Sequence, residues 1–499
     1  MKDYKIIDMQ NATHRLLAIL FICTACGSSH EQTGSERKPN IIYILADDMG
    51  YGDLSCYGQE KFETPNIDRL AAEGMLFTQH YSGSTVCAPS RATLMTGLHT
   101  GHTYVRGNRG MPGGQYPLPD SAFTLSEMLK KAGYVTGAFG KWGLGFPGSE
   151  GEPVNQGFDE FFGYISQTIA HNYYPWSLWH NTEEIILEGN EGDRREVYAP
   201  NLIQEKRLAF IETNKDTLFF MYMPSIIPHA ELAAPEAYIA RFLEKSSPEP
   251  NFELTSRFAP EMPYRGVDDV NHPRYKIGGY GSQAYPRATF AAMITLLDEH
   301  VGEIMDKIKA LGLEENTLII FSSDNGPHKE GGADPWFFNS NGPFKGHKRD
   351  AYEGAIRVPM IARWPDKITP GSKSDHISAF WDVVPTLADV AGVEKPAGRD
   401  GISFLPALLG EAQQEHPFLY WEFHAKRRQQ AVRKGSWKAI RTLNAEYAEN
   451  AVELYNLDMD LGEEKNVADQ HPEIVNEMLE IMEQSHVEHP DWPYYTEKR

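Results

Sequence analysis

Two largely apolar runs, each followed at once by acidic or amide residues, constrain the fold of this chain more than any other feature. They cover residues 41–46 and 317–323. A strand buried on both faces of a parallel sheet has a continuous apolar sequence, and ligands bind beyond the carboxyl ends of such strands. We therefore expect the residues that follow the two runs to meet at one edge of a sheet. They are Asp47, Asp48, Asp324 and Asn325.

These four side chains offer a set of ligands for a hard cation. Three are carboxylates and one is an amide, and none is His or Cys. Oxygen ligands of this kind suit Ca²⁺ ahead of Mg²⁺. An Asp-Asp pair alone is explained equally well by a solvated turn, but a matching Asp-Asn pair after a second strand favours the metal site.

Further apolar runs alternate with helical patterns up to about residue 395. This alternation predicts an α/β fold built on a doubly wound, mostly parallel sheet. Between 146 and 278 the chain is rich in Pro, Gly, Tyr and charge, and we expect long loops over the site there, interrupted by one strand. The expected strands are 74–77, 135–139 and 217–223, and the expected helices are 64–71, 124–133, 290–308 and 384–391.

The pattern changes after a Gly- and Pro-rich link that begins at residue 396. Short alternating strands and a last helix near 472–484 predict a small α+β domain with an antiparallel sheet. The expected organisation is therefore a leader over 1–38, a catalytic domain over 39–395 and a C-terminal subdomain over 396–499.

The N-terminus has the pattern of an export signal. Basic residues precede the apolar run 16–23, which is too short to span a bilayer, and a polar stretch extends to residue 38. A small residue before Cys26 resembles a bacterial lipoprotein signal, with a lipid anchor on that cysteine. Ordinary cleavage near Ala25 is the alternative. We expect an exported protein that is periplasmic or anchored to the outer membrane.

The charge balance excludes one class of partner. The formal net charge is −22 at pH 7, which makes nucleic acid an unsuitable ligand. An anionic substrate would then require a local cationic pocket on an acidic protein.

A short motif indicates the chemistry. Cys87-Ala88-Pro89-Ser90-Arg91, continued by Thr96-Gly97, places a small nucleophile at the start of a helix, where negative charge is favoured. The motif resembles the Cys-x-Pro-x-Arg signature of the formylglycine-dependent sulfatases. The resemblance implies an alkaline-phosphatase-like fold and conversion of Cys87 to 3-oxoalanine (formylglycine) by a formylglycine-generating maturation enzyme.

The resemblance also implies a mechanism and a set of residues. The hydrated aldehyde at position 87 would attack sulfur, and re-formation of the aldehyde would expel sulfate. Lys141 and Lys348 would bind the sulfate oxygens, Arg91 would hold the hydrate, and His229 would protonate the leaving alkoxide. The metal ligands of the family correspond to Asp47, Asp48, Asp324 and Asn325, joined by residue 87.

The chain departs from the family pattern at one position. Many relatives carry His two residues after the lysine, where this sequence has Gly143. The space is open to a side chain from elsewhere, and His171 is the candidate. A galactose or N-acetylgalactosamine 4-sulfate within a sulfated polysaccharide is the substrate that similar sulfatase segments imply. The residues expected to bind this saccharide are His171, His328, Arg349 and Asp350, with Trp336 beside them.

Two other functions remain open from the sequence. A phosphomonoesterase or phosphodiesterase of the same superfamily would need two metals with histidine ligands, for which His376 is the one hint. An inactive protein that binds sulfated glycans would carry an unmodified Cys87.

Overall fold

The main sheet has β1 (Asn40–Ala46) near its centre. Strand β1 pairs in parallel with β12 (Thr317–Ser323) on one side and with β9 (Phe219–Pro224) on the other, and β9 pairs in parallel with β5 (Val135–Lys141). The predicted strands at 41–46, 135–139, 217–223 and 317–323 are thus confirmed. The remaining strands of this sheet are β2 (Met75–Tyr81), β6 (Glu160–Tyr164), β7 (Ser177–His180), β8 (Glu183–Ile186), β13 (Arg357–Arg363), β14 (Ser372–Ser374) and β15 (Ser378–Ala379).

This description rests on a computed structural model that covers residues 37–111, 114–245, 254–267, 279–424, 428–443 and 452–494. The predicted export signal, with Cys26, lies outside the described residues. No helix within these ranges is both long enough and apolar enough to cross a membrane.

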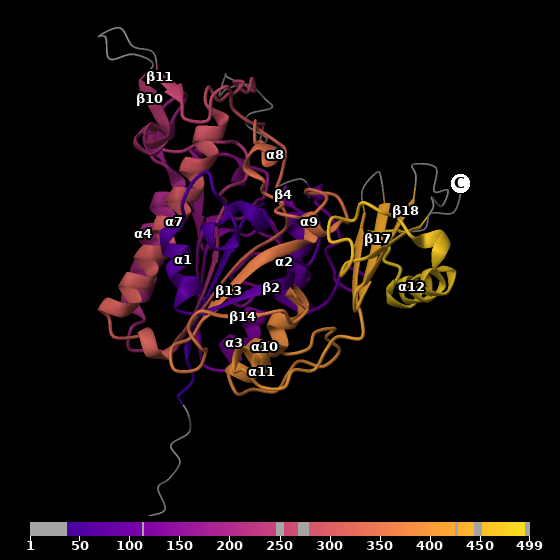
Figure 1. The fold of residues 1–499 in the computed structure, drawn as a ribbon. Helices are drawn as coiled ribbons and strands as arrows, with labels where there is room; N and C mark the ends of the chain where they lie inside the picture. Colours follow the sequence, from indigo (N-terminus) through magenta and orange to yellow (C-terminus); the bar gives the residue numbers. More distant parts are fainter. Residues whose placement is uncertain are drawn as a thin grey trace, which may run out of the picture. The chain divides into compact units, whose positions relative to one another are not determined.

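Helices cover both faces of the main sheet (Figure 1). Side chains of β1 alternate between two apolar cores, so Ile42 and Ile44 pack on one face and Ile41 and Tyr43 on the other. The first core is covered by α1 (Pro65–Ala72), α4 (Ala199–Thr213) and α7 (Pro286–Ala310). The second is covered by α2 (Cys87–Thr96), α3 (Leu125–Lys131) and α10 (Val383–Val390). This arrangement confirms the doubly wound α/β fold.

The smaller elements lie around this framework. The short helices are α5 (Glu236–Ile239), α8 (Pro335–Phe338), α9 (Glu353–Ile356) and α11 (Leu405–Leu408). Two short hairpins are β3 (Gly110–Met111) with β4 (Gly114–Gln115), and β10 (Leu243–Lys245) with β11 (Leu254–Ser256).

The C-terminal region contains the expected antiparallel sheet. Its strands run in the order β16 (Leu419–Phe423), β17 (Arg428–Lys434), β18 (Trp437–Leu443) and β19 (Glu453–Asn456). One face packs against α12 (Pro472–Ser485), and the other packs against residues of β2 and α9 (Figure 1).

The prediction of long loops between 146 and 278 is wrong for much of that range. Strands β6, β7 and β8 extend the main sheet there, and α4 covers it. Helix α4 lacks a clear apolar stripe because it buries two polar residues. Gln204 donates to the His300 carbonyl oxygen, and Arg207 donates to the Phe139 carbonyl oxygen. Tertiary hydrogen bonds therefore stabilise a helix whose sequence periodicity is weak.

Candidate active site

The ends of β1 and β12 bring together the four residues of the predicted cation site. Ala46 pairs with Ser323, so the residues that follow them are neighbours at the carboxyl edge of the sheet. The Asp48 N–H donates to Asp324 Oδ1 at 3.0 Å, and Asn325 Nδ2 donates to Asp48 Oδ1 at 2.7 Å. All four side chains are fully buried. The strand order thus brings these four side chains together at one edge of the sheet, as expected from the sequence.

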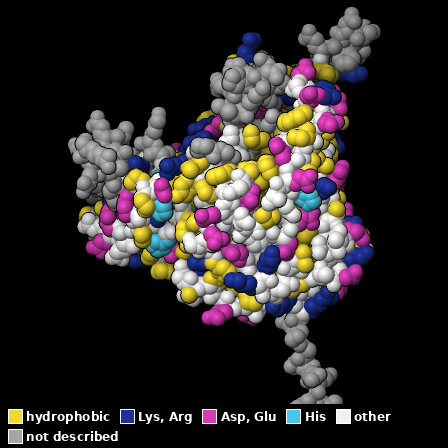
Figure 2. Space-filling model, turned by 180° about the vertical axis from the view of Figure 1, so that it is seen from behind, with side chains coloured by type: hydrophobic (Ala, Val, Ile, Leu, Met, Phe, Trp, Pro, Cys, Tyr) yellow, Lys and Arg dark blue, Asp and Glu magenta, His cyan; other side chains and the backbone are white. Residues whose placement is uncertain are grey.

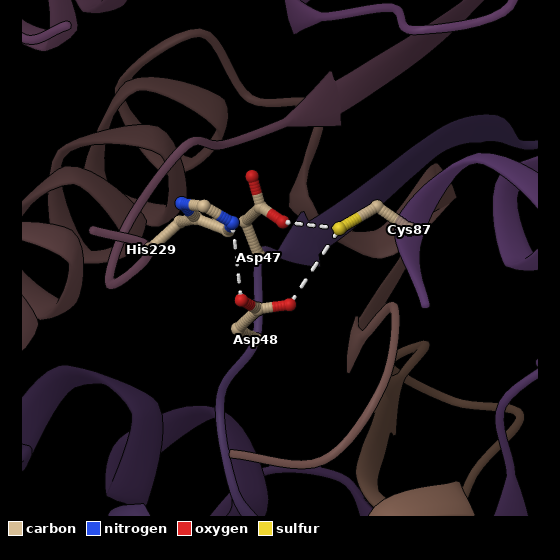
Figure 3. A group of neighbouring side chains, drawn as sticks. All are labelled: Asp47, Asp48, Cys87 and His229. Atoms are coloured by element: carbon tan, nitrogen blue, oxygen red, sulfur yellow. Dashed lines mark hydrogen bonds and ion pairs between the residues drawn. The ribbon is translucent and has the colours of Figure 1, made fainter. Parts of the chain in front are cut away.

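Cys87 is the first residue of α2 and faces the two aspartates. Its Sγ lies 3.3 Å from Asp47 Oδ1 and 3.6 Å from Asp48 Oδ1 (Figure 3). Burial, followed by the nearby Asp324 carboxylate, raises the pKa of the Cys87 thiol. The unmodified side chain is therefore a neutral thiol in this environment, which makes it a weak nucleophile.

Two cations pair with the carboxylates on the inner side of the cluster. Arg91 donates to Asp324 Oδ2 through both Nε and Nη2, at 3.0 and 2.8 Å, and to the Lys141 carbonyl oxygen at 2.6 Å. Lys141 Nζ donates to Asp47 Oδ2 at 2.7 Å. Arg91 and Lys141 are both fully buried. Because α2 supplies Arg91, its ion pair with Asp324 and its hydrogen bond to the Lys141 carbonyl oxygen fix the helix that carries Cys87 to the sheet.

Lys348 and His229 form the remaining part of the cluster. Lys348 Nζ donates to Asp48 Oδ2 at 2.6 Å and to His229 Nε2 at 2.9 Å, and His229 Nε2 lies 3.2 Å from Asp48 Oδ2. Burial, then Lys348 and His171, lower the pKa of His229 well below its usual value. His229 Nδ1 donates to the Ala230 carbonyl oxygen. The imidazole is therefore neutral, with Nε2 as an acceptor toward Lys348.

The carboxylates are close enough for their charges to interact. Burial opposes the ionisation of Asp47, but Lys141 and Arg91 outweigh it and lower the pKa of Asp47. Burial and the Asp47 charge raise the pKa of Asp324 to about 7. Crowded carboxylates of this kind are stabilised by a bound cation.

The donor set fits such a cation. Asn325 Oδ1 is buried and accepts no hydrogen bond from any described residue, although its Nδ2 is used. Unsatisfied buried acceptors are rare, so this oxygen is suited to a ligand that the protein itself does not supply. Asp47, Asp48, Cys87 and His229 also form a group whose ligand atoms lie within 4.8 Å of one another. A hard cation matches the oxygen donors among these residues, which are the Asp47 and Asp48 carboxylates and Asn325 Oδ1.

The charges of the site contrast with those of the surface. On the face shown in Figure 2, Lys and Arg side chains are scattered among acidic ones. The site instead concentrates buried cations around one point: Arg91, Lys141 and Lys348. Cations are thus concentrated at the site of a protein with net charge −22, and each lies beside a carboxylate of the cluster.

The residues predicted to bind the saccharide differ in how close they lie to the central cluster. The His171 ring stacks on His229 with centroids 4.6 Å apart, and His328 stacks on His229 at 5.5 Å. Arg349 is exposed and forms an ion pair with Glu330. Asp350 Oδ2 accepts a hydrogen bond from the backbone of its own loop, from the His347 N–H. His171 and His328 thus join the central cluster, and Arg349 pairs with Glu330, whose carboxylate lies within 4.8 Å of ligand atoms of Asp48 and His328. The Asp350 carboxylate instead contacts its own loop.

Sequence reasoning missed two side chains close to this cluster. Asn108 Oδ1 accepts a hydrogen bond from the Ala88 N–H at 3.0 Å, beside Cys87 at the start of α2. Gln167 lies against Gly143, where a Cβ atom would come 3.2 Å from Gln167 Oε1. Neither residue belongs to a motif, and contacts between distant segments reveal them. The space at Gly143, assigned to His171 from the sequence, is thus bordered by Gln167.

Comparisons with known proteins agree with this geometry. The family model described as Sulfatase matches residues 39–393, and the one described as N-sulphoglucosamine sulphohydrolase, C-terminal, matches residues 344–488. An N-acetylgalactosamine-6-O-sulfatase of Bacteroides thetaiotaomicron is 31% identical over 95% of this chain and 99% of its own length. The N-acetylgalactosamine-6-sulfatase of Canis lupus familiaris is 31% identical over 84% of this chain and 74% of its own length.

A solved structure supports the same assignment. The crystal structure of Ps i-CgsB in complex with k-i-k-neocarrahexaose has a TM-score of 0.72 and 28% sequence identity, and the match covers 92% of this chain and 96% of that chain. Family, relatives and fold therefore agree over most of the described residues. This chain belongs to the sulfatase family, whose members are sulfuric ester hydrolases, within the alkaline-phosphatase-like superfamily.

Proposed function

We propose that this protein hydrolyses sulfate esters of galactose-type sugars, with a formylglycine at position 87 and a bound Ca²⁺. The observation that carries the proposal is the position of Cys87. It begins a helix inside a buried cluster of three carboxylates and three cations, beside an acceptor that no described residue uses. A formylglycine hydrate at this position supplies an oxygen nucleophile that can later leave, which a thiol does not.

We assign the cation to the ends of β1 and β12. Asp47, Asp48, Asp324 and Asn325 would hold it together with residue 87, and their all-oxygen donors favour Ca²⁺ over Mg²⁺. When bound, the ion would offset the carboxylate charges and polarise a sulfate oxygen.

The cationic side chains of the site have different roles in the proposed reaction. Lys141 and Lys348 bind sulfate oxygens and offset the charge that develops as the S–O bond breaks. Arg91 positions the helix, because it joins Asp324 to the Lys141 carbonyl oxygen. Their fixed ion pairs preorganise these groups before the substrate binds.

The geometry refines the expected role of His229. A neutral imidazole with Nε2 accepting from Lys348 does not itself hold the proton for the leaving alkoxide. We assign that proton to Lys348 Nζ, which its hydrogen bonds to His229 Nε2 and Asp48 Oδ2 hold in place.

The proposed substrate is a saccharide because of the relatives. Two relatives at 31% identity are named N-acetylgalactosamine-6-sulfatases, and a structural neighbour at 28% identity is bound to a neocarrahexaose. The sequence segments favoured sulfate at position 4, whereas these names specify position 6. We therefore propose galactose or N-acetylgalactosamine as the sugar and test both sulfate positions.

The proposal extends to organisation and maturation. We propose a catalytic domain over 39–395, a C-terminal subdomain over 396–499, modification of Cys87 by a formylglycine-generating enzyme, and export to the periplasm with a lipid anchor at Cys26. The mass of the mature N-terminal peptide tests export, since an intact Met1 contradicts it.

The decisive assay measures sulfate release from regiodefined 4- and 6-sulfates of galactose and N-acetylgalactosamine, with an aryl sulfate and an aryl phosphate as references. Sulfate release with little phosphate release supports the proposal, and a strong phosphate preference assigns the chain to the phosphoesterases. Within the described residues, His376 belongs to no group able to hold a second metal. An unmodified Cys87 and no turnover would indicate a glycan-binding protein.

A further inference from the structure

Gln167 carries a buried amide oxygen that the protein leaves unused. Its side chain is part of a residue only 6% exposed, and Oε1 accepts no hydrogen bond from any described residue. A buried acceptor without a partner destabilises the folded protein, because the hydrogen bonds that it made to water are not replaced. The position is therefore suited to a group that arrives with a ligand.

The segment that contains Gln167 runs along the end of β5. The Trp142 N–H donates to the Tyr164 carbonyl oxygen at 2.8 Å, and the Gly143 N–H donates to the Ile165 carbonyl oxygen at 3.1 Å. Gln167 follows two residues later. Its backbone is thus tied to the strand that delivers Lys141 to the site.

Gly143 has no side chain, and the Gln167 amide borders the space that a side chain there would occupy. Its φ is +76°, in the left-handed region that favours glycine, and a Cβ atom there would lie 3.2 Å from Gln167 Oε1. After Gln167, a short turn leads to His171, which stacks on His229. Gln167 therefore lies against Gly143, in the stretch of chain between the residues bonded to the end of β5 and His171 of the histidine stack.

The hydrogen-bonding capacity of the Gln167 amide limits which ligand groups it can bind. Oε1 is only an acceptor, so its partner must carry an O–H or N–H. A sulfate ester at neutral pH has no such donor, but the hydroxyl or acetamido groups next to it on a sugar do. An amide that can also donate through Nε2 matches a hydroxyl, which both donates and accepts.

We propose that Gln167 is a specificity-determining residue that hydrogen-bonds a hydroxyl or acetamido group of the sugar beside the sulfate ester. This inference rests on the proposed function. It predicts that the enzyme distinguishes a sugar sulfate from a sulfate ester that lacks neighbouring donors.

The test compares Gln167→Leu with the wild-type enzyme on two substrates. These are N-acetylgalactosamine 6-sulfate and 4-nitrophenyl sulfate, whose aryl group has no O–H or N–H. We expect kcat/KM for the sugar to fall at least about tenfold more than for the aryl ester, because the variant leaves the sugar donor unpaired. We expect no decrease in Tm, because the unused amide is removed.

Gln156→Leu is the matched control. Gln156 is as deeply buried, and its Oε1 also accepts no hydrogen bond from any described residue. It differs in that its Nε2 donates to the Glu150 carbonyl oxygen at 3.0 Å. We expect this control to lower Tm and to leave the ratio of the two kcat/KM values unchanged. Gln167→Met repeats the measurement if the leucine variant does not fold.

Equal losses on both substrates, no loss on either, or a decrease in Tm like that of the control would overturn the inference. Failure of the wild-type enzyme to release sulfate from any of the 4- and 6-sulfates of galactose and N-acetylgalactosamine would instead refute the proposed function. In that case, calorimetric binding of the sugar sulfate still decides the role of Gln167. Weaker binding by Gln167→Leu supports the role, and equal binding excludes it.

Discussion

Each carboxylate of the site has a cation at hydrogen-bonding distance. Asp47 pairs with Lys141, Asp48 with Lys348, and Asp324 with Arg91. Buried charges are tolerated only when they are paired and hydrogen-bonded. The pairs therefore keep charged groups in place where water is excluded, and they make each cation hard to replace.

Lys348→Met removes one of these cations. We expect kcat for the sugar sulfate to fall by about 100-fold or more, as on loss of one group that stabilises transition-state charge. Lys345→Met is the control, because Lys345 Nζ donates instead to the Glu463 carbonyl oxygen. Steady-state kinetics of both variants provide the measurement. A kcat for Lys348→Met close to that of the wild type would contradict the assigned role.

Removal of the cation from its proposed site is expected to affect both activity and stability. After treatment with a chelator, sulfate release and Tm should both decrease, and Ca²⁺ should restore them better than Mg²⁺. Asn325→Ala should shift the Ca²⁺ titration of activity to higher concentrations, because it removes the acceptor that no described residue uses. Activity that is insensitive to chelation would exclude a required metal.

At the scale of elements, the N-terminus of α2 determines where residue 87 lies. The Val86 N-cap position has no capping side chain, and Asn108 Oδ1 accepts from the Ala88 N–H instead. A distant loop therefore satisfies one of the free N–H groups at the start of this helix.

Asn108→Ala removes that acceptor. We expect a loss of about 1 kcal/mol in the free energy of unfolding, as for other helix-capping substitutions. Asn108→Asp keeps an acceptor oxygen and should recover most of this loss. Urea denaturation of the two variants gives the comparison, and equal stability of Asn108→Ala and the wild type would show that the bond contributes nothing.

The sequence predicts some of these helices and strands well and others poorly. The apolar runs located β1 and β12 to within one residue, because a strand buried on both faces has little freedom in composition. Helix α4 was not predicted, since its buried Gln204 and Arg207 depend on partners in other elements. The site follows a similar rule. Strand ends and the cysteine motif identify its centre, whereas a lone glutamine such as Gln167 has no sequence signal.

At the scale of the whole molecule, a buried acid joins the catalytic region to the C-terminal sheet. Glu422 of β16 accepts hydrogen bonds from Arg106 at 3.0 Å, His424 at 2.7 Å and His486 at 2.8 Å. Burial opposes its ionisation, but His424, His486 and Arg106 together lower the pKa of Glu422. The charge of this one residue thus stabilises contacts among three segments far apart in sequence.

Because the pKa of Glu422 is lower in the folded protein than in the unfolded chain, the contribution of Glu422 to stability depends on pH in a known direction. The unfolded chain binds a proton at Glu422 more readily than the folded protein does, so this stabilisation is present above about pH 4.5 and is lost as pH falls further. Glu422→Gln should cost about 3–5 kcal/mol near neutral pH by leaving Arg106 unpaired. Its difference from the wild type should shrink below pH 4.5, whereas exposed Glu480→Gln should show no effect. A difference that is independent of pH would contradict this account.

In the proposed reaction, residue 87 is the group that attacks the sulfate ester. The most direct measurement is sulfate release from N-acetylgalactosamine 6-sulfate by Cys87→Ala and by Cys56→Ala, produced with the same maturation enzyme, with the peptide mass at position 87 recorded for the wild type. We predict an oxoalanine mass in the wild type, no turnover by a folded Cys87→Ala protein, and wild-type turnover by Cys56→Ala. Turnover by Cys87→Ala close to that of the wild type would contradict the central claim.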